Sequence, residues 1–209
     1  MLNVGLTGGI ATGKSTVVRM LVGKGARVID HDGLVHILQE PGQPVWKSII
    51  AAFGRDILDP EDRIDRKKLG ALVFVDEKRR KMLEGIVHPA VLEEGRRQRE
   101  EIVKKDEQAI ILSDIPLLLE VGMQNEFDLV LLVYAPPEVQ ILRVMKRNNL
   151  TREEAIARLT SQMPIDEKLK FADLVIRNDG TIRELEKRVD EVWQELILRE
   201  RAKRAEGRG

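Results

Sequence analysis

The segment Gly8–Ser15 constrains the fold of this chain more than any other feature. It reads Gly-Gly-Ile-Ala-Thr-Gly-Lys-Ser and matches the pattern G-x-x-x-x-G-K-[ST] at every defined position. A loop of this pattern wraps its backbone amides around a polyphosphate, and glycines permit the close approach. The pattern has this meaning only where a strand precedes it and a helix follows, because the helix N-terminus favours negative charge.

Both flanks of the loop fit that requirement. The apolar run Leu2–Thr7 predicts a buried parallel strand, and Lys14–Lys24 carries apolar residues at helical spacing and ends before Gly25. Ala26–Ile29 predicts a second short strand. Strand, loop, helix and strand in this order form a βαβ unit and favour a parallel sheet. The glycine spacing differs from the dinucleotide pattern G-x-G-x-x-G, so we do not expect hydride-transfer chemistry.

Three later apolar runs supply the remaining strands, giving an expected α/β fold with a five-stranded sheet. They are Ala109–Ser113, Leu129–Tyr134 and Leu174–Ile176. Between residues 33 and 107 the pattern is helical instead. Helices are expected over Val45–Phe53, Arg66–Val75 and Glu77–Lys105. The last should be broken or kinked at His88-Pro89, because proline lacks an amide hydrogen and crowds the preceding turn.

The C-terminal part of the chain also reads as helical outside its last strand. Glu138–Lys170 is a charged helical stretch. The capping-box pattern, which marks helix starts, occurs at Thr151 with Glu154 and at Thr181 with Glu184. The terminal helix has one apolar stripe, which the charged tail Arg199–Gly209 lacks, so we expect the tail to fray.

Composition narrows the class of protein. Lys and Arg total 35, as do Asp and Glu, so no excess of charge favours a nucleic-acid or membrane partner. The chain has no cysteine, which excludes disulfides, thiolate zinc sites and a cysteine nucleophile. No apolar run approaches the ~18 residues of a membrane-spanning helix, and the N-terminus lacks the pattern of a signal peptide. We therefore expect a cytoplasmic protein of 209 residues in one domain.

Two aspartates, Asp30 and Asp32, follow the second expected strand. Ligands of open parallel sheets bind at the carboxyl ends of the strands, so one of these carboxylates is a candidate to accept the proton of an attacking hydroxyl or to orient it. The alternative is a purely structural role as a helix cap, for which Asp32 sits well. His31, between them, is expected to face solvent.

The blocks GLTGGIATGKST and VIDHD resemble the start of dephospho-CoA kinases, and the resemblance continues in order along the chain. It runs through Asp65-Arg66, Val75-Asp76, Leu83-Glu84, Ile86–Pro89, Pro116–Glu120, Arg143–Arg147, Gln162 and Val175–Gly180. The phosphate loop alone is shared by many enzymes. The ordered set spans residue 5 to about residue 180 and is much more specific.

The resemblance implies a P-loop kinase fold with a five-stranded parallel sheet flanked by helices, a helical substrate-binding insertion and a lid. A single domain would cover 1–209, with its core at about 1–32, 108–138 and 172–200, the acceptor region at about 33–107 and the lid at about 140–165. The implied reaction uses ATP and Mg²⁺ to phosphorylate the ribose 3′-hydroxyl of dephospho-CoA, the last step of coenzyme A biosynthesis. No obligate protein partner, nucleic acid or membrane is implied.

The loop motif and the resemblance together assign candidate site residues. For ATP they are Gly9, Ala11, Thr12, Gly13, Lys14, Ser15, Thr16, Arg143, Asn178 and Gly180. The catalytic candidates are Asp32 as general base, Lys14 and Arg147. Asp32, Arg66, His88 and Leu117 are expected to contact the acceptor, and Ser15 and Asp114 the magnesium ion. Structural readings stay open, namely solvent-exposed charges for the two lid arginines, an ordinary turn for 178–180 and helix packing for His88-Pro89.

Three positions depart from the family pattern: His31 where alanine is common, Asn148 where aspartate follows the second lid arginine, and Arg177 where an acidic residue is common. Two alternatives to the implied function also stay open. One is another small-metabolite or nucleoside monophosphate kinase on the same scaffold. The other is a nucleotide-switch or ATP-driven binding protein without an acceptor.

Overall fold

The computed structural model of the chain describes residues 1–206. The chain divides into two compact units. The first combines Met1–Ile29 with the residues from Glu101 onward, and the second consists of Asp30–Glu100. Every residue of the sheet belongs to the first unit except Asp30, which ends the second strand and begins the second unit.

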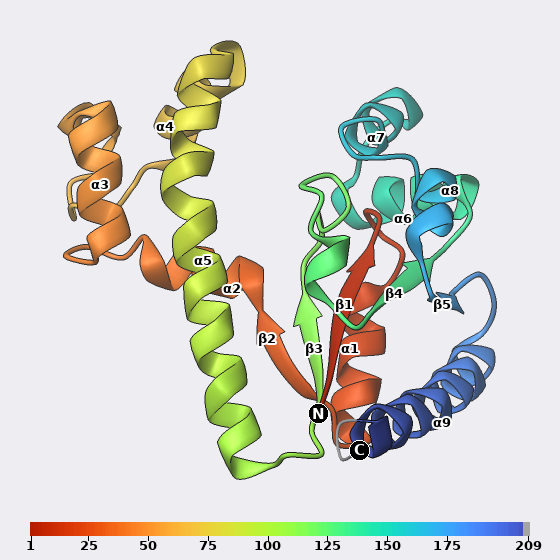
Figure 1. Ribbon diagram of the computed structural model, residues 1–209. Helices are drawn as coiled ribbons and strands as arrows, with labels where there is room; N and C mark the ends of the chain where they lie inside the picture. The colour runs from red at the N-terminus through yellow and green to blue at the C-terminus, as the bar shows by residue number, and fades with distance from the viewer. Residues whose placement is uncertain (207–209) are drawn as a thin grey trace. The chain divides into compact units, whose positions relative to one another are not determined.

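The sheet has five strands in the order β2-β3-β1-β4-β5 (Figure 1). They are β1 (Leu2–Gly8), β2 (Arg27–Asp30), β3 (Ile110–Asp114), β4 (Leu129–Tyr134) and β5 (Leu174–Arg177). β1 pairs in parallel with β3 and β4, and β4 pairs in parallel with β5. The expected five-stranded parallel sheet is therefore confirmed, and the loop after β1 leaves the sheet at its centre.

Burial explains why these segments are strands. Every residue of β1 and β4 is buried, which is what continuous apolar runs predict for the centre of a parallel sheet. The main core packs strand residues such as Leu6 and Leu131 against Leu21 of the first helix and Val189 of the last. The core thus fixes the position of the helix that follows the phosphate loop.

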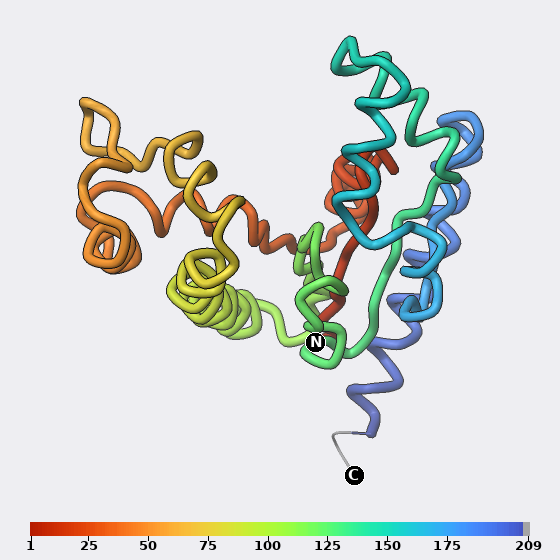
Figure 2. Tube along the Cα trace, turned by 90° about the horizontal axis from the view of Figure 1, so that it is seen from above, coloured from red at the N-terminus to blue at the C-terminus, as the bar shows by residue number. Residues whose placement is uncertain are grey.

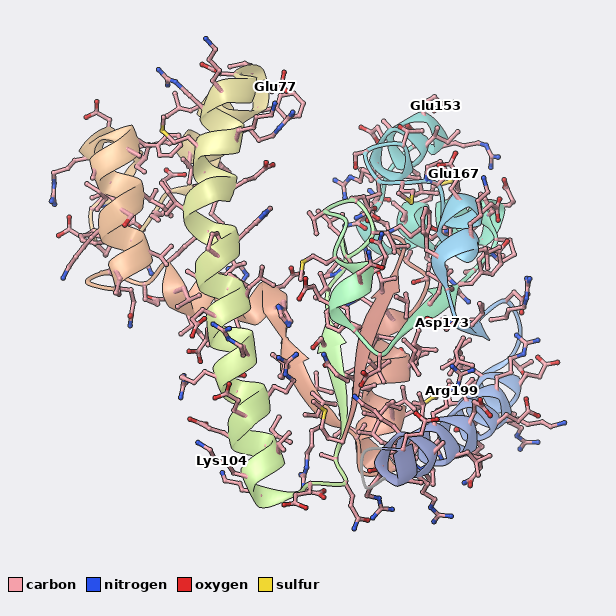
Figure 3. All side chains as sticks on the ribbon, viewed as in Figure 1. Glu77, Lys104, Glu153, Glu167, Asp173 and Arg199 are labelled. Carbon is pink, nitrogen blue, oxygen red and sulfur yellow. The ribbon has the colours of Figure 1, made fainter. Side chains whose placement is uncertain are left out.

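The first unit contains α1 (Lys14–Gly23), α6 (Pro137–Asn148), α7 (Arg152–Leu159), α8 (Ile165–Lys168) and α9 (Ile182–Glu206), with short 3-10 turns at Gln124–Glu126 and Leu169–Phe171. α7 begins at the expected capping box, in which the Thr151 hydroxyl accepts from the Glu154 amide at 3.2 Å and the Glu154 carboxylate accepts from the Thr151 amide at 2.8 Å. Asp173, labelled in Figure 3, leads into β5 and accepts a hydrogen bond from the Val130 amide at 2.7 Å.

The expectation of a frayed tail is wrong for residues 199–206, which continue α9, while 207–209 lie outside the described residues. Ion pairs replace the missing apolar stripe. Glu200 is buried and lies 3.6 Å from both the Met1 amino group and the Arg204 guanidinium. The Lys203 ammonium contacts the Asp128 carboxylate at 2.6 Å. Met1 and Asp128 are distant in sequence from the helix residues they contact, so helical periodicity alone missed these two pairs.

The second unit is helical and contains α2 (His31–Leu38), α3 (Pro44–Phe53), a 3-10 turn at Arg55–Ile57, α4 (Arg66–Val75) and most of α5 (Glu77–Lys105). Both views show α3 and α5 as roughly parallel rods (Figure 1 and Figure 2). The prediction of a helix broken or kinked at Pro89 is wrong as to a break, because α5 continues through it from Glu77 to Lys104 and beyond (Figure 3). A proline removes one helix hydrogen bond, and the buried neighbours Val87 and Val91 anchor the turns around it.

The start of α2 corrects two expectations. Asp30, not Asp32, is the helix cap, because its carboxylate accepts a hydrogen bond from the Gly33 amide at 3.0 Å. His31 does not face solvent, since only 8% of it is exposed. Burial, with a smaller contribution from Arg99, lowers the His31 pKa to about 4 against the opposing effect of Asp30, so the imidazole is neutral at pH 7. Asp32 lies in the exposed first turn.

No helix among residues 1–206 combines the length and the apolar character needed to cross a membrane.

The buried His31 ring makes Gly95 of α5 a sensitive position. A Cβ at residue 95 would lie 2.8 Å from the His31 Cε1, whereas one at Gly85 in the same helix would meet nothing within 4 Å. Gly85→Ala should therefore raise the free energy of unfolding by about 0.5–1 kcal/mol, and Gly95→Ala should lower it. In a His31→Ala background Gly95→Ala should become stabilising. Urea unfolding of the four variants checks this, and equal effects of Gly95→Ala in both backgrounds would contradict it.

Candidate active site

The phosphate loop adopts a conformation that depends on its glycines. Gly13 has a φ of 88° directly before α1, a left-handed value that favours glycine, and Ala11 has a φ of 57°. The loop also closes on itself. The buried Thr12 hydroxyl donates to the Gly9 carbonyl at 2.9 Å. The sequence pattern and the observed backbone agree that this segment is an anion-binding loop at the start of a helix.

Asn178, which follows β5, supports the loop from outside. Its amide Nδ2 donates to the Thr12 carbonyl at 2.8 Å, and its backbone amide donates to the Tyr134 carbonyl at 2.7 Å. The same side chain lies so close to Gly13 that a Cβ there would overlap it. Asn178 therefore ties the phosphate loop to the end of β4. Glycine is required at position 13 for its φ value and also because the Asn178 side chain lies so close to it.

A hollow of about 720 Å³ in the first unit lies over the loop. Its lining residues are Gly9, Ala11, Gly13, Lys14, Ser15, Thr16, Arg143, Lys146, Arg147 and Asn178. Within the described part of the chain the lining includes four basic side chains and no acidic one. Three of them, Arg143, Lys146 and Arg147, have the i, i+3, i+4 spacing that places residues on one face of a helix. The hollow therefore combines helix-terminal amides with four cations, which suits a polyphosphate.

Lys14 of the loop forms an ion pair with Asp114, the last residue of β3. Both side chains are largely buried. Asp114 is in place because β3 pairs with β1 in a register that sets Leu6 opposite Asp114. A bound polyphosphate would compete with this carboxylate for the Lys14 ammonium, so the pair holds the lysine at the site in the absence of ligand.

Most sequence-predicted ATP residues thus gather around one hollow, with Thr12 buried beneath it. Gly180 is not among the lining residues and lies beside Glu184 at the start of α9. Arg143 also donates to the Ala11 carbonyl at 3.3 Å, and Arg147 donates to the Asn148 side chain at 3.1 Å. Leu117 is 44% exposed in the loop after β3.

Three predicted residues, Asp32, Arg66 and His88, belong to the second unit. His88 is exposed on α5. Arg66 contacts both ring nitrogens of His36, and the two side chains line a hollow of about 270 Å³ together with Gln39, Glu40, Asp59, Arg63 and Ile64. Arg63 in turn pairs with Asp59 at 3.0 Å. Desolvation alone would raise the pKa of the Asp59 carboxyl, but the hydrogen bonds and the charge of Arg63 keep that pKa below its usual value. The second unit therefore has a mixed-charge hollow with two arginines.

The departure at Arg177 has a structural explanation. The Arg177 guanidinium carbon lies 4.7 Å from the centre of the Tyr134 ring, a cation–π distance. Asp179, two residues later, pairs with Arg188 at 2.6 Å, which lowers the pKa of the Asp179 carboxyl. The turn that carries Asn178 is therefore held from both sides by side chains of its own unit.

Sequence reasoning missed Lys146 and Lys168. Lys146 was detectable from its helical spacing to Arg143. Lys168 is fully buried although it stands in a charged stretch, and no pattern marked it. Its ammonium contacts the Glu120 carboxylate at 2.8 Å, the Pro116 carbonyl at 3.3 Å and the Gly8 carbonyl at 3.5 Å.

We call Lys168, Glu120 and the Met163 amide the buried clip, because the same Glu120 oxygen accepts from Met163 N at 3.1 Å. The clip joins three segments of the first unit. These are the start of the phosphate loop, the loop after β3 and the segment that follows α7. All three donors of the lysine have an acceptor within reach, which is how a buried ammonium is tolerated.

Comparison with known proteins gives one consistent result. A sequence model of the dephospho-CoA kinase family matches residues 2–184. A dephospho-CoA kinase from Syntrophus aciditrophicus is 50% identical over 204 residues, covering 98% of this chain and 87% of that protein.

Two solved structures agree with this match. A dephospho-CoA kinase from Campylobacter jejuni is 34% identical with a TM-score of 0.69, covering 92% of this chain and 96% of that one. A protein from Thermus thermophilus is 38% identical with a TM-score of 0.75, again covering 92% of this chain and 96% of that one.

The buried clip predicts a large difference between two neighbouring lysines. Lys168→Met leaves the Glu120 carboxylate, whose side chain is only 20% exposed, without its cation and should lower the free energy of unfolding by about 3 kcal/mol. Lys170→Met removes an exposed ammonium two residues later and should change it by less than about 0.5 kcal/mol. Adding Glu120→Leu to Lys168→Met should recover part of the loss. Denaturant unfolding measures all three, and equal effects of the two lysine variants would refute the role of the clip.

Proposed function

Because the chain belongs to the dephospho-CoA kinase family, we propose that it transfers the γ-phosphoryl group of ATP to the ribose 3′-hydroxyl of dephospho-CoA, giving coenzyme A and ADP. The observation that carries this proposal is the four-cation hollow over the phosphate loop at the centre of the sheet. Such a site takes a nucleoside triphosphate and concentrates positive charge where the phosphoryl group is transferred.

The loop residues would bind the phosphates of ATP. The amides of Gly9 to Gly13 would enclose them, Thr16 would bond the α-phosphate, and Lys14 would move from Asp114 to the β- and γ-phosphates. Arg143 and Arg147 would neutralise charge on the transferring group. Asn178 and Gly180 would border the nucleoside end.

Magnesium is part of the proposal, and the donor set fits it. Ser15 lines the hollow and Asp114 contacts Lys14 beside it, which supplies one hydroxyl and one carboxylate. Mg²⁺ in kinases is usually held by one or two such groups together with substrate phosphates and water, rather than by a cage of protein ligands. The ion would neutralise charge on the phosphate oxygens.

The second unit would bind the acceptor, as proposed for residues 33–107. Asp32, exposed in the first turn of α2, would accept the proton of the 3′-hydroxyl as its oxygen attacks the γ-phosphorus. The new O–P bond forms as the bond to the bridging oxygen of ADP breaks. Arg66, beside His36, would bind acceptor phosphate, and His88 would contact another part of that substrate. Leu117 would contact the acceptor from the first unit.

Residues 140–165 would act as the lid, comprising most of α6 together with α7 and the segment after it. Closure over ATP would exclude water, which otherwise competes with the acceptor for the phosphoryl group. A cytoplasmic location, where ATP and the acceptor are both present, is proposed on the same basis.

The acceptor assay tests the proposal directly. With ATP and Mg²⁺ the protein should phosphorylate dephospho-CoA, and NMR of the product should place the new phosphate on the 3′-oxygen. AMP and UMP should be poor acceptors at equal concentration. Efficient phosphorylation of either monophosphate, with none of dephospho-CoA, would favour the alternative kinase and exclude the proposed function.

The general-base role of Asp32 predicts a selective loss. Asp32→Asn should lower kcat by roughly 10²–10⁴-fold, because the amide cannot accept the proton, while the Kd for ATP stays within about twofold. Asp56→Asn, another exposed aspartate of the second unit, should leave kcat unchanged. Steady-state kinetics and calorimetric ATP titration measure both quantities. Full turnover of Asp32→Asn would remove this residue from the mechanism.

A further inference from the structure

A second hollow of about 210 Å³ lies in the first unit on the other side of Gly9, which lines it as well as the phosphate hollow. Its walls come from the start of the phosphate loop, the first turns of α6, the α7 helix and the segment that follows α7. The apolar lining includes Ile10, Ile141, Ile156, Leu159, Met163 and Ile165. Within the described part of the chain no charged residue lines it.

The hollow lies at one end of the expected path of the phosphates. The lysine of such a loop reaches the β- and γ-phosphates, and the amides at the start of the helix cradle the inner ones. The nucleoside end of ATP therefore lies toward Thr16 and Asn178, and the outer phosphate lies toward Gly9. A ligand group in the second hollow would be adjacent to the transferring phosphoryl group rather than to the base of ATP.

The chemistry of the acceptor identifies which of its groups fits there. The reacting hydroxyl is on C3′ of a ribose whose C1′ carries adenine, so the base is always within one sugar ring of the reacting atom. The diphosphate is attached to C5′ and needs cationic side chains to bind it. The residues that the structure describes as lining this hollow include no cation. An uncharged heteroaromatic ring suits an apolar hollow with a few polar groups.

The polar groups of the hollow are amides and a hydroxyl, which can pair with ring nitrogens and an amino group. They come from Gln140, Thr160 and Gln162. Gln140 is only 2% exposed, and its Nε2 donates to the Ala135 carbonyl at 2.7 Å. Its Oε1 would lie 2.8 Å from a Cβ at Gly9, so the side chain faces the shared edge of the two hollows.

The wall formed by residues 162–165, at the end of the proposed lid, is held by hydrogen bonds in the absence of a ligand. The Met163 amide donates to Glu120 Oε1, and the Lys168 ammonium contacts the same oxygen at 2.8 Å. A preformed wall reduces the ordering cost of binding a rigid ring. The Lys168–Glu120 pair thereby gains a role beyond stability, because it connects this wall to the Gly8 carbonyl of the phosphate loop.

We propose that this hollow, which we call the base pocket, binds the adenine ring of the acceptor and thereby places the 3′-hydroxyl. The proposal rests on the proposed function, since it assigns a subsite for the same acceptor. It makes Gln162 a specificity-determining residue, because its amide can pair with the edge of the ring.

The test fills the pocket from an exposed position. Ile156 lines the pocket and is 39% exposed, so Ile156→Trp can occupy the pocket without opening the core. Ile182→Trp is the matched control, because Ile182 is 57% exposed at the start of α9 and is not among the pocket-lining residues. Ile156→Trp should raise the KM for dephospho-CoA at least tenfold and the KM for ATP less than twofold, while Ile182→Trp changes neither.

Fragments of the acceptor then identify the bound group. With a saturating non-hydrolysable ATP analogue filling the donor site, the Kd of AMP, which carries the base, should rise at least tenfold in Ile156→Trp. The Kd of 4′-phosphopantetheine, which carries the arm, should stay within twofold. The reverse pattern would assign the pocket to the arm and overturn the proposal. Gln162→Leu keeps a side chain of similar size but removes the amide. It should raise the Kd of AMP and leave the Kd of 4′-phosphopantetheine unchanged.

The controls distinguish a failure of the base pocket from a failure of the proposed function. If wild-type protein phosphorylates dephospho-CoA but Ile156→Trp keeps its KM, the base pocket is wrong and the proposed function stands. If Ile156→Trp raises the KM for ATP as strongly as that for the acceptor, the hollow belongs to the donor and the proposal is overturned. If wild-type protein does not phosphorylate dephospho-CoA, both fail together. Unfolding curves of each variant verify that it remains folded.

Discussion

The attraction between a polyphosphate and the N-terminus of α1 is the interaction on which the functional architecture depends. The phosphate loop can hold an anion only if its amides converge, which requires a left-handed Gly13 and a fixed helix start. The buried strand β1, between β3 and β4, supplies the fixed point on one side. Asn178 supplies it on the other, through its bond to the Thr12 carbonyl. Much of the first-unit core serves to hold this loop in place.

The four cationic side chains over the loop come from two elements, α1 and α6, and are positioned in different ways. Lys14 is held by a carboxylate that the parallel register brings to it. Arg143, Lys146 and Arg147 lie in the second half of α6, where positive side chains also interact favourably with the helix dipole. The first cation is positioned by the sheet and the other three by a helix of the proposed lid. Charge at the site can therefore change with the lid while the loop itself remains fixed.

The buried clip shows how separate segments are made to act together. Lys168 joins the phosphate loop, the loop after β3 and the segment after α7, with all its donors occupied. Removing Lys168 or Glu120 alone would leave the other charge without its partner in a largely buried site, so the pair ties these segments to one another. Its neighbours form a wall of the base pocket, which connects the packing of the first unit to the proposed choice of acceptor.

The sequence by itself determined the local structure. Apolar runs identified the five strands, the capping box identified the start of α7, and the loop motif identified the phosphate site, because each depends on neighbouring residues alone. The tertiary structure decided what depends on distant partners. It buried His31 against α5, extended α9 through the pairs of Glu200 and Lys203, and buried Lys168. A charged or polar side chain carries no local mark of the partner that will compensate its burial, and only the folded chain supplies that partner.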